Sequence, residues 1–237
     1  MTTDEDDDMN IPTTTKETII IKEKCTYGTG TRVWDCSVLM AKYFEYNFGK
    51  IFDFNDEKGE NETIDDSYRI LELGAGCGLL SISLAKLFSM YNIKKKKNSI
   101  KIFATEYSTP IIQHLKENCL NNQVLYNGED ESSGIVSCHK LDWYEKELEG
   151  VLKDSEMTAS STSSSPFHMV IISDCTLTPS DATALIHVMK RFAVPKITTF
   201  CVGLCKEREG TKLFVELARK EFNIVGEIAG EQIGDDF

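Results

Sequence analysis

The sequence predicts one α/β domain built on a mostly parallel, doubly wound sheet. Its 237 residues, 41% hydrophobic and 27% charged, suit a single domain of ordinary size. A short apolar strand at residues 69–73 runs into three glycines at alternate positions and then into an apolar helical stretch at 79–87. Strand-like and helix-like segments alternate from there onward, which is typical of a parallel sheet with helices on both faces.

The remaining elements follow from runs of apolar residues and their spacing. In chain order they are a strand at 101–106, a helix at 109–120, a strand at 135–141, an apolar run at 168–174, a helix at 181–192, a strand at 197–204, a helix at 209–221 and a final strand at 222–228. The connections between several of them are rich in Asn, Lys and Ser, which predicts loop insertions of low complexity.

Residues 1–15 are predicted to form a disordered acidic tail and residues 16–237 the folded domain. The tail carries the acidic run at 4–8 and lacks a positively charged start, so it does not resemble a signal peptide.

A formal net charge of −12 argues against a surface that grips nucleic-acid phosphates and favours a basic protein partner. No apolar run approaches the roughly 18 residues of a membrane helix, so no membrane contact is expected.

Cysteine usage indicates a reducing compartment. The eight cysteines are scattered and none forms a C-x-x-C pair, so neither a metal site nor a disulfide framework is predicted. We therefore expect a cytoplasmic protein, with the nucleus as a further compartment.

The glycine-rich turn is the strongest chemical clue. Gly74, Gly76 and Gly78 follow the pattern G-x-G-x-G, whereas a dinucleotide fingerprint needs a glycine where Leu79 stands. Glu72 adds an acid beside the turn, which repels a pyrophosphate and suits a cationic or amino-acid-bearing ligand. The turn therefore predicts S-adenosylmethionine as the cofactor in preference to NAD.

Polar or aromatic residues close the following strands, at the sheet edge where α/β folds bind ligands. Glu106 ends the second strand, where a carboxylate can accept hydrogen bonds from both ribose hydroxyls. Asp142 and Trp143 end the third, with an acid for the adenine amino group and an indole for the ring face. Ser173 and Asp174 end the fourth, next to the transferable methyl group.

Five segments of the sequence carry a resemblance to a known family. They are G-T-R-V-W-D-C-S-V-L-M-A-K-Y-F at 30–44, L-E-L-G-A-G-C-G at 71–78, T-E-Y at 105–107, L-D-W at 141–143 and S-D-C-T-L at 173–177. Together they resemble the seven-β-strand (class I) S-adenosylmethionine-dependent protein lysine methyltransferases of the methyltransferase-like family 16 type, over roughly residues 27–228. The resemblance implies a Rossmann-like fold, and its V-W-D segment is much more specific than the glycine motif.

The resemblance also implies roles for the matching positions. In the family a leading tryptophan packs on the cofactor, the glycine loop holds its methionine side, an acid holds the ribose, an aromatic residue stacks near adenine, and a small residue precedes the acid after the fourth strand. In this sequence those cofactor-binding positions are Trp34, Gly74, Ala75, Gly76, Glu106, Trp143 and Ser173. Asp174 is the acid that follows, and it is the expected catalytic residue.

The sequence departs from the family pattern in two places. After the fourth strand the family has Asp-x-x-Tyr, but Leu177 stands where the tyrosine is expected. Either Tyr107 or Tyr144 substitutes, the acceptor differs, or catalysis has been lost. A seven-strand sheet also needs two strands after residue 221, and only 222–228 remains for them, so the last strand is expected to be absent or very short.

The expected function is transfer of a methyl group to a lysine side-chain nitrogen of a protein substrate. The alternatives are a non-catalytic, degenerate methyltransferase acting as an interaction module, a small-molecule or nucleic-acid methyltransferase, and an NAD oxidoreductase. The net charge and the lack of an N-P-P-Y-type sequence disfavour nucleic acid. The position of Leu79 disfavours NAD.

Overall fold

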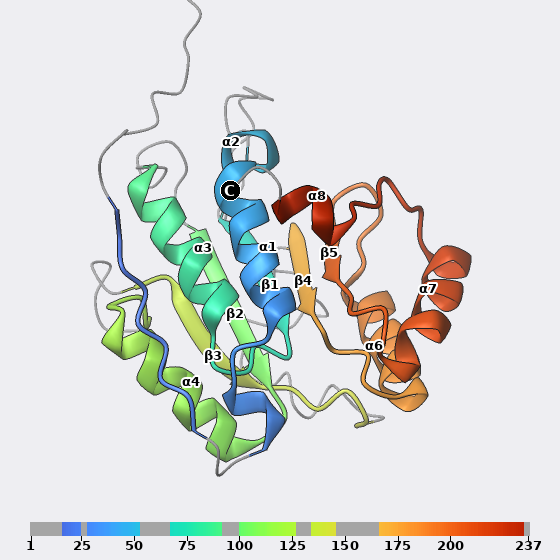
Figure 1. Cartoon of the computed structure of the whole chain (residues 1–237), viewed down its shortest axis with the longest axis horizontal. Helices are drawn as coiled ribbons and strands as arrows, with labels where there is room; N and C mark the ends of the chain where they lie inside the picture. The colour runs from blue at the N-terminus through green and yellow to red at the C-terminus, as the bar shows by residue number, and fades with distance from the viewer. Residues whose placement is uncertain are drawn as a thin grey trace, which may run out of the picture.

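A parallel β-sheet forms the centre of the protein, as a computed structural model shows for residues 16–24, 28–52, 67–91, 100–126, 134–145 and 166–234 (Figure 1). Within these residues the sheet has five strands in the order β3-β2-β1-β4-β5. The strands are β1 (Tyr68–Leu73), β2 (Ile100–Glu106), β3 (Val136–Lys140), β4 (Met169–Ser173) and β5 (Thr199–Gly203), and every adjacent pair is parallel. The chain order reverses at β1, as in other doubly wound sheets.

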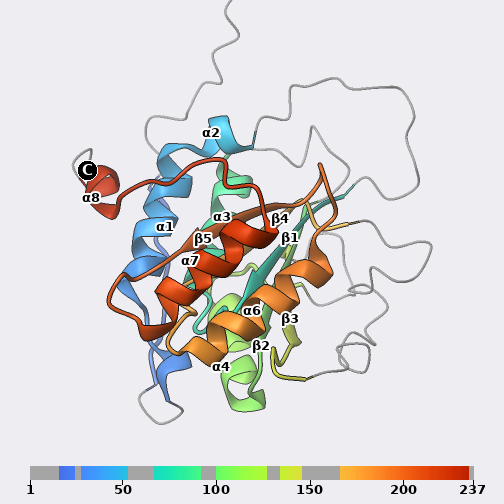
Figure 2. The same cartoon turned by 90° about the vertical axis from the view of Figure 1, so that its right-hand side faces the viewer.

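Helices cover both faces of the sheet. On one face lie α1 (Asp35–Tyr46), α2 (Phe48–Ile51), α3 (Leu79–Met90) and α4 (Thr109–Asn121). On the other face lie α6 (Pro179–Phe192) and α7 (Glu209–Glu221), which stand in front of the sheet in Figure 2. The short elements η2 (Thr29–Thr31) and α8 (Gly230–Gly234) precede α1 and follow α7. The predicted α/β class is confirmed.

The two layers of core follow from the alternation of side chains along the strands. Ile70 and Ile102 pack with α1, α3 and α4, whereas Leu71, Phe103 and Val170 pack with α6 and α7. All five side chains are at most 1% exposed. Strands buried on both sides need nearly continuous apolar sequence, and the strand sequences have this character.

An extended segment at 16–24 is held against α4 by two asparagine side chains four residues apart. Asn122 accepts from the Ile20 N–H at 2.9 Å and donates to the Ile20 carbonyl at 2.8 Å. Asn118 pairs in the same way with Lys22, at 3.1 Å for both bonds. Each amide thus imitates the edge of a β-strand, and the segment runs along α3 and α4 in Figure 1.

The predicted final strand at 222–228 is wrong. Phe222 packs against Phe200 of β5 with tilted rings, 5.1 Å between ring centroids, but the chain then leaves the sheet without strand pairing. Val225 is 93% exposed, so its apolar side chain has no core to join. The described part of the chain therefore ends its sheet at β5, and continues to α8, which lies against α1.

Two further predictions concern the acidic tail and membrane-spanning segments. The acidic tail at 1–15 lies outside them, and no helix within them is long and apolar enough to cross a membrane.

Candidate functional site

The glycine turn joins β1 to α3 at the C-terminal edge of the sheet, the lower edge in Figure 1. Gly74, Gly76 and Gly78 have φ angles of 71°, 57° and 90°, a region that favours glycine. A Cβ atom on Gly74 would lie 2.8 Å from the Cys175 sulfur, and one on Gly76 would lie 3.0 Å from the Gly30 carbonyl oxygen. The three alternate glycines are therefore required by backbone shape and by close packing.

Glu72 is buried, and its carboxylate pairs inside the fold and is not presented to a ligand as predicted. Its carboxylate accepts hydrogen bonds from the Ser81 N–H at 3.1 Å and from the Ser81 hydroxyl, in the first turn of α3. Burial raises the pKa of Glu72 to about 7. This acid braces β1 against the helix that follows the turn.

Glu106 lies where the sequence predicts a ribose-binding acid. Its Oε1 accepts from the Gly76 N–H at 2.9 Å, and its Oε2 accepts from the Tyr107 N–H at 3.1 Å. Burial raises the pKa of Glu106, while the two N–H donors lower it. Each carboxylate oxygen has a second lone pair, so the group can still accept from two ligand hydroxyls.

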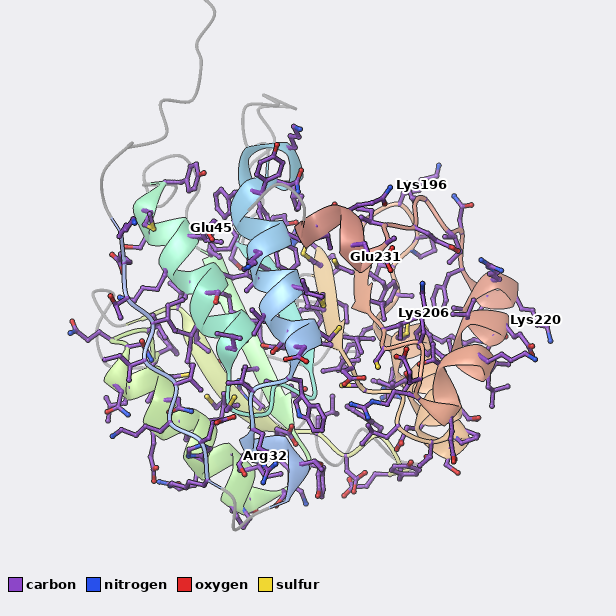
Figure 3. All side chains as sticks on the ribbon, viewed as in Figure 1. Arg32, Glu45, Lys196, Lys206, Lys220 and Glu231 are labelled. Carbon is purple, nitrogen blue, oxygen red and sulfur yellow. The ribbon has the colours of Figure 1, made fainter. Side chains whose placement is uncertain are left out.

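The segment that leads into α1 lies across the glycine turn. The Cys77 thiol donates to the Arg32 carbonyl at 3.5 Å, and a Cβ on Gly30 would lie 3.7 Å from Glu106 Oε1. Arg32 appears at the lower edge of the molecule in Figure 3, below α1 and α3. The segment 28–34, the glycine turn and the end of β2 therefore form one contiguous surface.

Trp143 lies against the glycine turn, beside Gly74. A Cβ on Gly74 would lie 3.0 Å from Trp143 Cζ2, so glycine is what allows the indole to approach. The ring also packs against the apolar core under α6 and α7. Its position is consistent with an adenine neighbour, and that role stays a prediction.

Asp174 is held at the end of β4 by a bidentate ion pair. Arg208 Nε donates to Oδ1 at 3.0 Å and Arg208 Nη2 to Oδ2 at 2.7 Å. The Asp174 side chain is 4% exposed and its φ is 51°, while its N–H donates to the Gly203 carbonyl at 3.0 Å. A left-handed backbone in a non-glycine residue is a strained arrangement that clusters at functional sites.

Trp34 and Ser173 complete the group around Asp174. The Trp34 indole N–H donates to the Thr29 carbonyl at 3.1 Å, and the Arg208 guanidinium lies 5.0 Å from the centroid of its ring. The Ser173 hydroxyl is buried and lies beside the Cys36 thiol. The sequence did not point to Arg208, because no motif surrounds it and 34 residues separate it from Asp174.

The structure favours Tyr144 over Tyr107 as the phenol nearest to Leu177. The Tyr144 hydroxyl donates to Asp181 Oδ1 at 2.5 Å, and Asp181 forms a capping box with Thr178 at the start of α6. Burial, together with the Asp181 carboxylate, raises the pKa of Tyr144 to about 12, so the phenol stays protonated. Both phenols are largely exposed, Tyr144 by 56% and Tyr107 by 60%, but Tyr107 neighbours Glu106 and not Asp181.

The site residues brought together at this edge fit S-adenosylmethionine. A glycine turn follows β1, a carboxylate that can still accept hydrogen bonds ends β2, and a small hydroxyl residue ends β4, all on one edge of the sheet. A sheet and an edge of this kind are typical of class I methyltransferases.

Comparison with known proteins assigns the family. The family model described as lysine methyltransferase matches residues 13–221, and the chain belongs to this family. Its cofactor is therefore S-adenosylmethionine. None of the curated proteins matches the chain.

Several solved structures have a similar chain path. The fibrillarin pre-rRNA processing protein of Methanococcus jannaschii is 18% identical, with a TM-score of 0.45 over 76% of this chain and 67% of that one. The CcbJ methyltransferase from Streptomyces caelestis is 13% identical, with a TM-score of 0.39 over 75% of this chain and 55% of its own. A chain of a fibrillarin/Nop5p complex is 15% identical, with a TM-score of 0.47, and the likeness covers 89% of this chain and 87% of that one. With TM-scores below 0.5, none of these likenesses bears on the function of this protein.

Proposed function

We propose that this protein transfers the methyl group of S-adenosylmethionine to the side-chain nitrogen of a lysine in a protein substrate. The observation that carries the proposal is the buried Asp174 carboxylate at the end of β4, on the same sheet edge as the glycine turn and Glu106. Membership of the lysine methyltransferase family supports the choice of acceptor. The net charge of −12 suits a basic substrate.

The chain's own residues would supply binding and orientation. Glu106 would accept hydrogen bonds from the ribose hydroxyls. The turn at 74–76 would contact the methionine part of the cofactor, and Trp143 would lie near the adenine ring. Bound S-adenosylmethionine supplies an activated methyl group on a sulfonium. A lysine ammonium has no lone pair, so its proton must leave to water while Asp174 keeps the nitrogen in line. Such positioning can contribute on the order of 7–11 kcal/mol.

Cofactor binding is the first test, because it does not require the unknown substrate. Calorimetric titration with S-adenosylhomocysteine should show binding by the wild type and a loss of at least tenfold in Glu106→Gln. Glu216→Gln, an exposed acid on α7, is the matched control and should bind like the wild type. No binding by the folded wild type would contradict the assignment of this edge as the cofactor site.

Methyl transfer is the second test. Cell extract incubated with the protein and radiolabelled S-adenosylmethionine should show a labelled protein band, and amino-acid analysis should identify methyllysine. Asp174→Asn should lose most of the label while still binding S-adenosylhomocysteine. Full turnover by this variant would remove Asp174 from the mechanism, and a labelled residue other than lysine would change the acceptor.

A second candidate is a non-catalytic interaction module that binds the cofactor without turnover. It is supported by Leu177, whose exposed apolar side chain stands where the family has a phenol, and by the Arg208 guanidinium that already occupies both oxygens of Asp174. Tight binding of S-adenosylhomocysteine without labelling of any extract protein would favour this alternative.

A further inference from the structure

Arg208 comes from the loop between β5 and α7, on which Lys206 is also labelled in Figure 3. Its guanidinium meets two groups that recognise cations. One is the Asp174 carboxylate, reached by both hydrogen bonds of a bidentate pair at 3.0 Å and 2.7 Å. The other is the face of the Trp34 ring, 5.0 Å from the guanidinium carbon to the centroid. A carboxylate and an indole face together make a binding site for a cation.

The exposure of the two partners is unequal. The Asp174 side chain is 4% exposed, whereas that of Arg208 is 29% exposed. The carboxylate is thus part of the fixed wall, and the arginine side chain covers it from the solvent side. A buried carboxylate without a partner is costly, so a cation, a proton or water must replace the guanidinium whenever Arg208 leaves this position.

The loop that carries Arg208 is held without the guanidinium. The Thr211 hydroxyl donates to the Cys205 carbonyl at 2.7 Å and lies 2.7 Å from the Thr176 hydroxyl. The Thr211 N–H donates to the Arg208 carbonyl at 3.1 Å. These bonds tie the loop backbone to the end of β4, so the arginine side chain can swing out while its backbone and Asp174 stay in place.

We propose that Arg208 is a specificity-determining residue that competes with the cationic acceptor for the site formed by Asp174 and Trp34. This inference rests on the proposed function, in which the acceptor is a lysine ammonium oriented by Asp174. The guanidinium fills the cation site of the free protein, and an acceptor reaches Asp174 only by displacing it.

The competition selects among acceptors by their other contacts. A guanidinium makes two parallel hydrogen bonds to a carboxylate, whereas an ammonium is a single strongly hydrated point charge. An isolated lysine therefore displaces Arg208 poorly, and only a substrate that gains further contacts around the site succeeds. Each added methyl group removes an N–H donor from the lysine nitrogen, which weakens its hydrogen bonding to Asp174.

Binding of n-butylammonium, a probe for the lysine side chain, tests the competition without methyl transfer. The probe is titrated at constant ionic strength into protein saturated with S-adenosylhomocysteine, or into free protein if that ligand does not bind. The indole N–H signal of Trp34 in the ¹⁵N spectrum reports occupancy. The chain has two tryptophans, so Trp143→Phe assigns the signal.

Arg208→Gln is expected to bind n-butylammonium at least tenfold more tightly than the wild type. Arg208→Lys keeps the charge but loses the bidentate contact, so an intermediate gain is expected. Adding Asp174→Asn to Arg208→Gln should abolish the gain. Equal or weaker binding by both single variants overturns the proposal and leaves Arg208 as a residue that merely positions Asp174.

The outcome separates this inference from the proposed function. Tighter probe binding by Arg208→Gln, combined with no lysine methylation by any variant, supports the internal competitor and contradicts the lysine acceptor. Lysine methylation without a change in probe binding supports the lysine acceptor and contradicts the role of Arg208 as an internal competitor.

Discussion

Replacing Glu72 by Gln should change how the stability of the protein depends on pH. Burial raises the pKa of Glu72 from 4.5 to about 7 in the folded protein, so between these values the folded state binds more protons than the unfolded chain. Stability contributed by this carboxyl is therefore fully present below pH 4.5 and is lost as the pH rises through 7. At 1.36 kcal/mol for each pKa unit, the loss amounts to about 3 kcal/mol.

Glutamine keeps an oxygen that can accept from the Ser81 N–H and hydroxyl, but it never ionises. The stability of Glu72→Gln relative to the wild type should thus rise by about 3 kcal/mol between pH 4.5 and pH 8. Urea unfolding of both proteins at half-unit pH steps measures this difference, and taking the difference removes the contribution of every other titrating group. A difference that stays flat over this range would refute the reasoning.

Three further substitutions test the turn, the asparagine pairs and the core. Gly74→Ala forces a Cβ to 2.8 Å from the Cys175 sulfur at a φ of 71°, so thermal unfolding should show a loss of about 1–3 kcal/mol and calorimetry weaker S-adenosylhomocysteine binding. Asn118→Ala removes two hydrogen bonds to Lys22 and one to the Cys77 carbonyl. We expect the free energy of unfolding to fall by about 2–4 kcal/mol and hydrogen exchange at the Lys22 amide to become faster. Phe88→Ala should cost about 3–5 kcal/mol in urea unfolding, since its fully buried ring leaves a cavity.

Most of the fold could be predicted from the sequence because the strands are buried on both faces. Apolar runs bounded by polar residues located β1, β2 and β4 within a residue or two, and the glycines located the start of α3. The run at 222–228 failed for the converse reason. It has a similar apolar content but no neighbouring strand, and β-structure depends on its partners more than on its own residues.

The candidate site was predictable where strand order alone brings residues together. Glu106, Trp143 and Asp174 lie at or just after the ends of three different strands, and parallel pairing places those ends on one edge. Strand order could not predict the contacts of Arg208 or Asn118. The Arg208 contacts depend on how a loop packs, and the Asn118 contacts depend on how an N-terminal segment packs against a helix far away in the chain. Two asparagines four residues apart on one helix were a readable signal, but their spacing does not reveal their partner.

The pairing of residues 16–24 with α4 also sets an order of events during synthesis. Ile20 finds Asn122 at a sequence separation of 102 residues. At roughly 5–20 residues per second, the ribosome delivers this partner about 5–20 seconds after the segment itself. During that interval the segment has nothing to dock on, and the stretch at 28–34 that follows it is not yet fixed over the glycine turn. The newborn chain therefore already contains the glycine turn and Glu106 when residues 16–24 can first dock, whereas Trp143 and Ser173 are still to be synthesised.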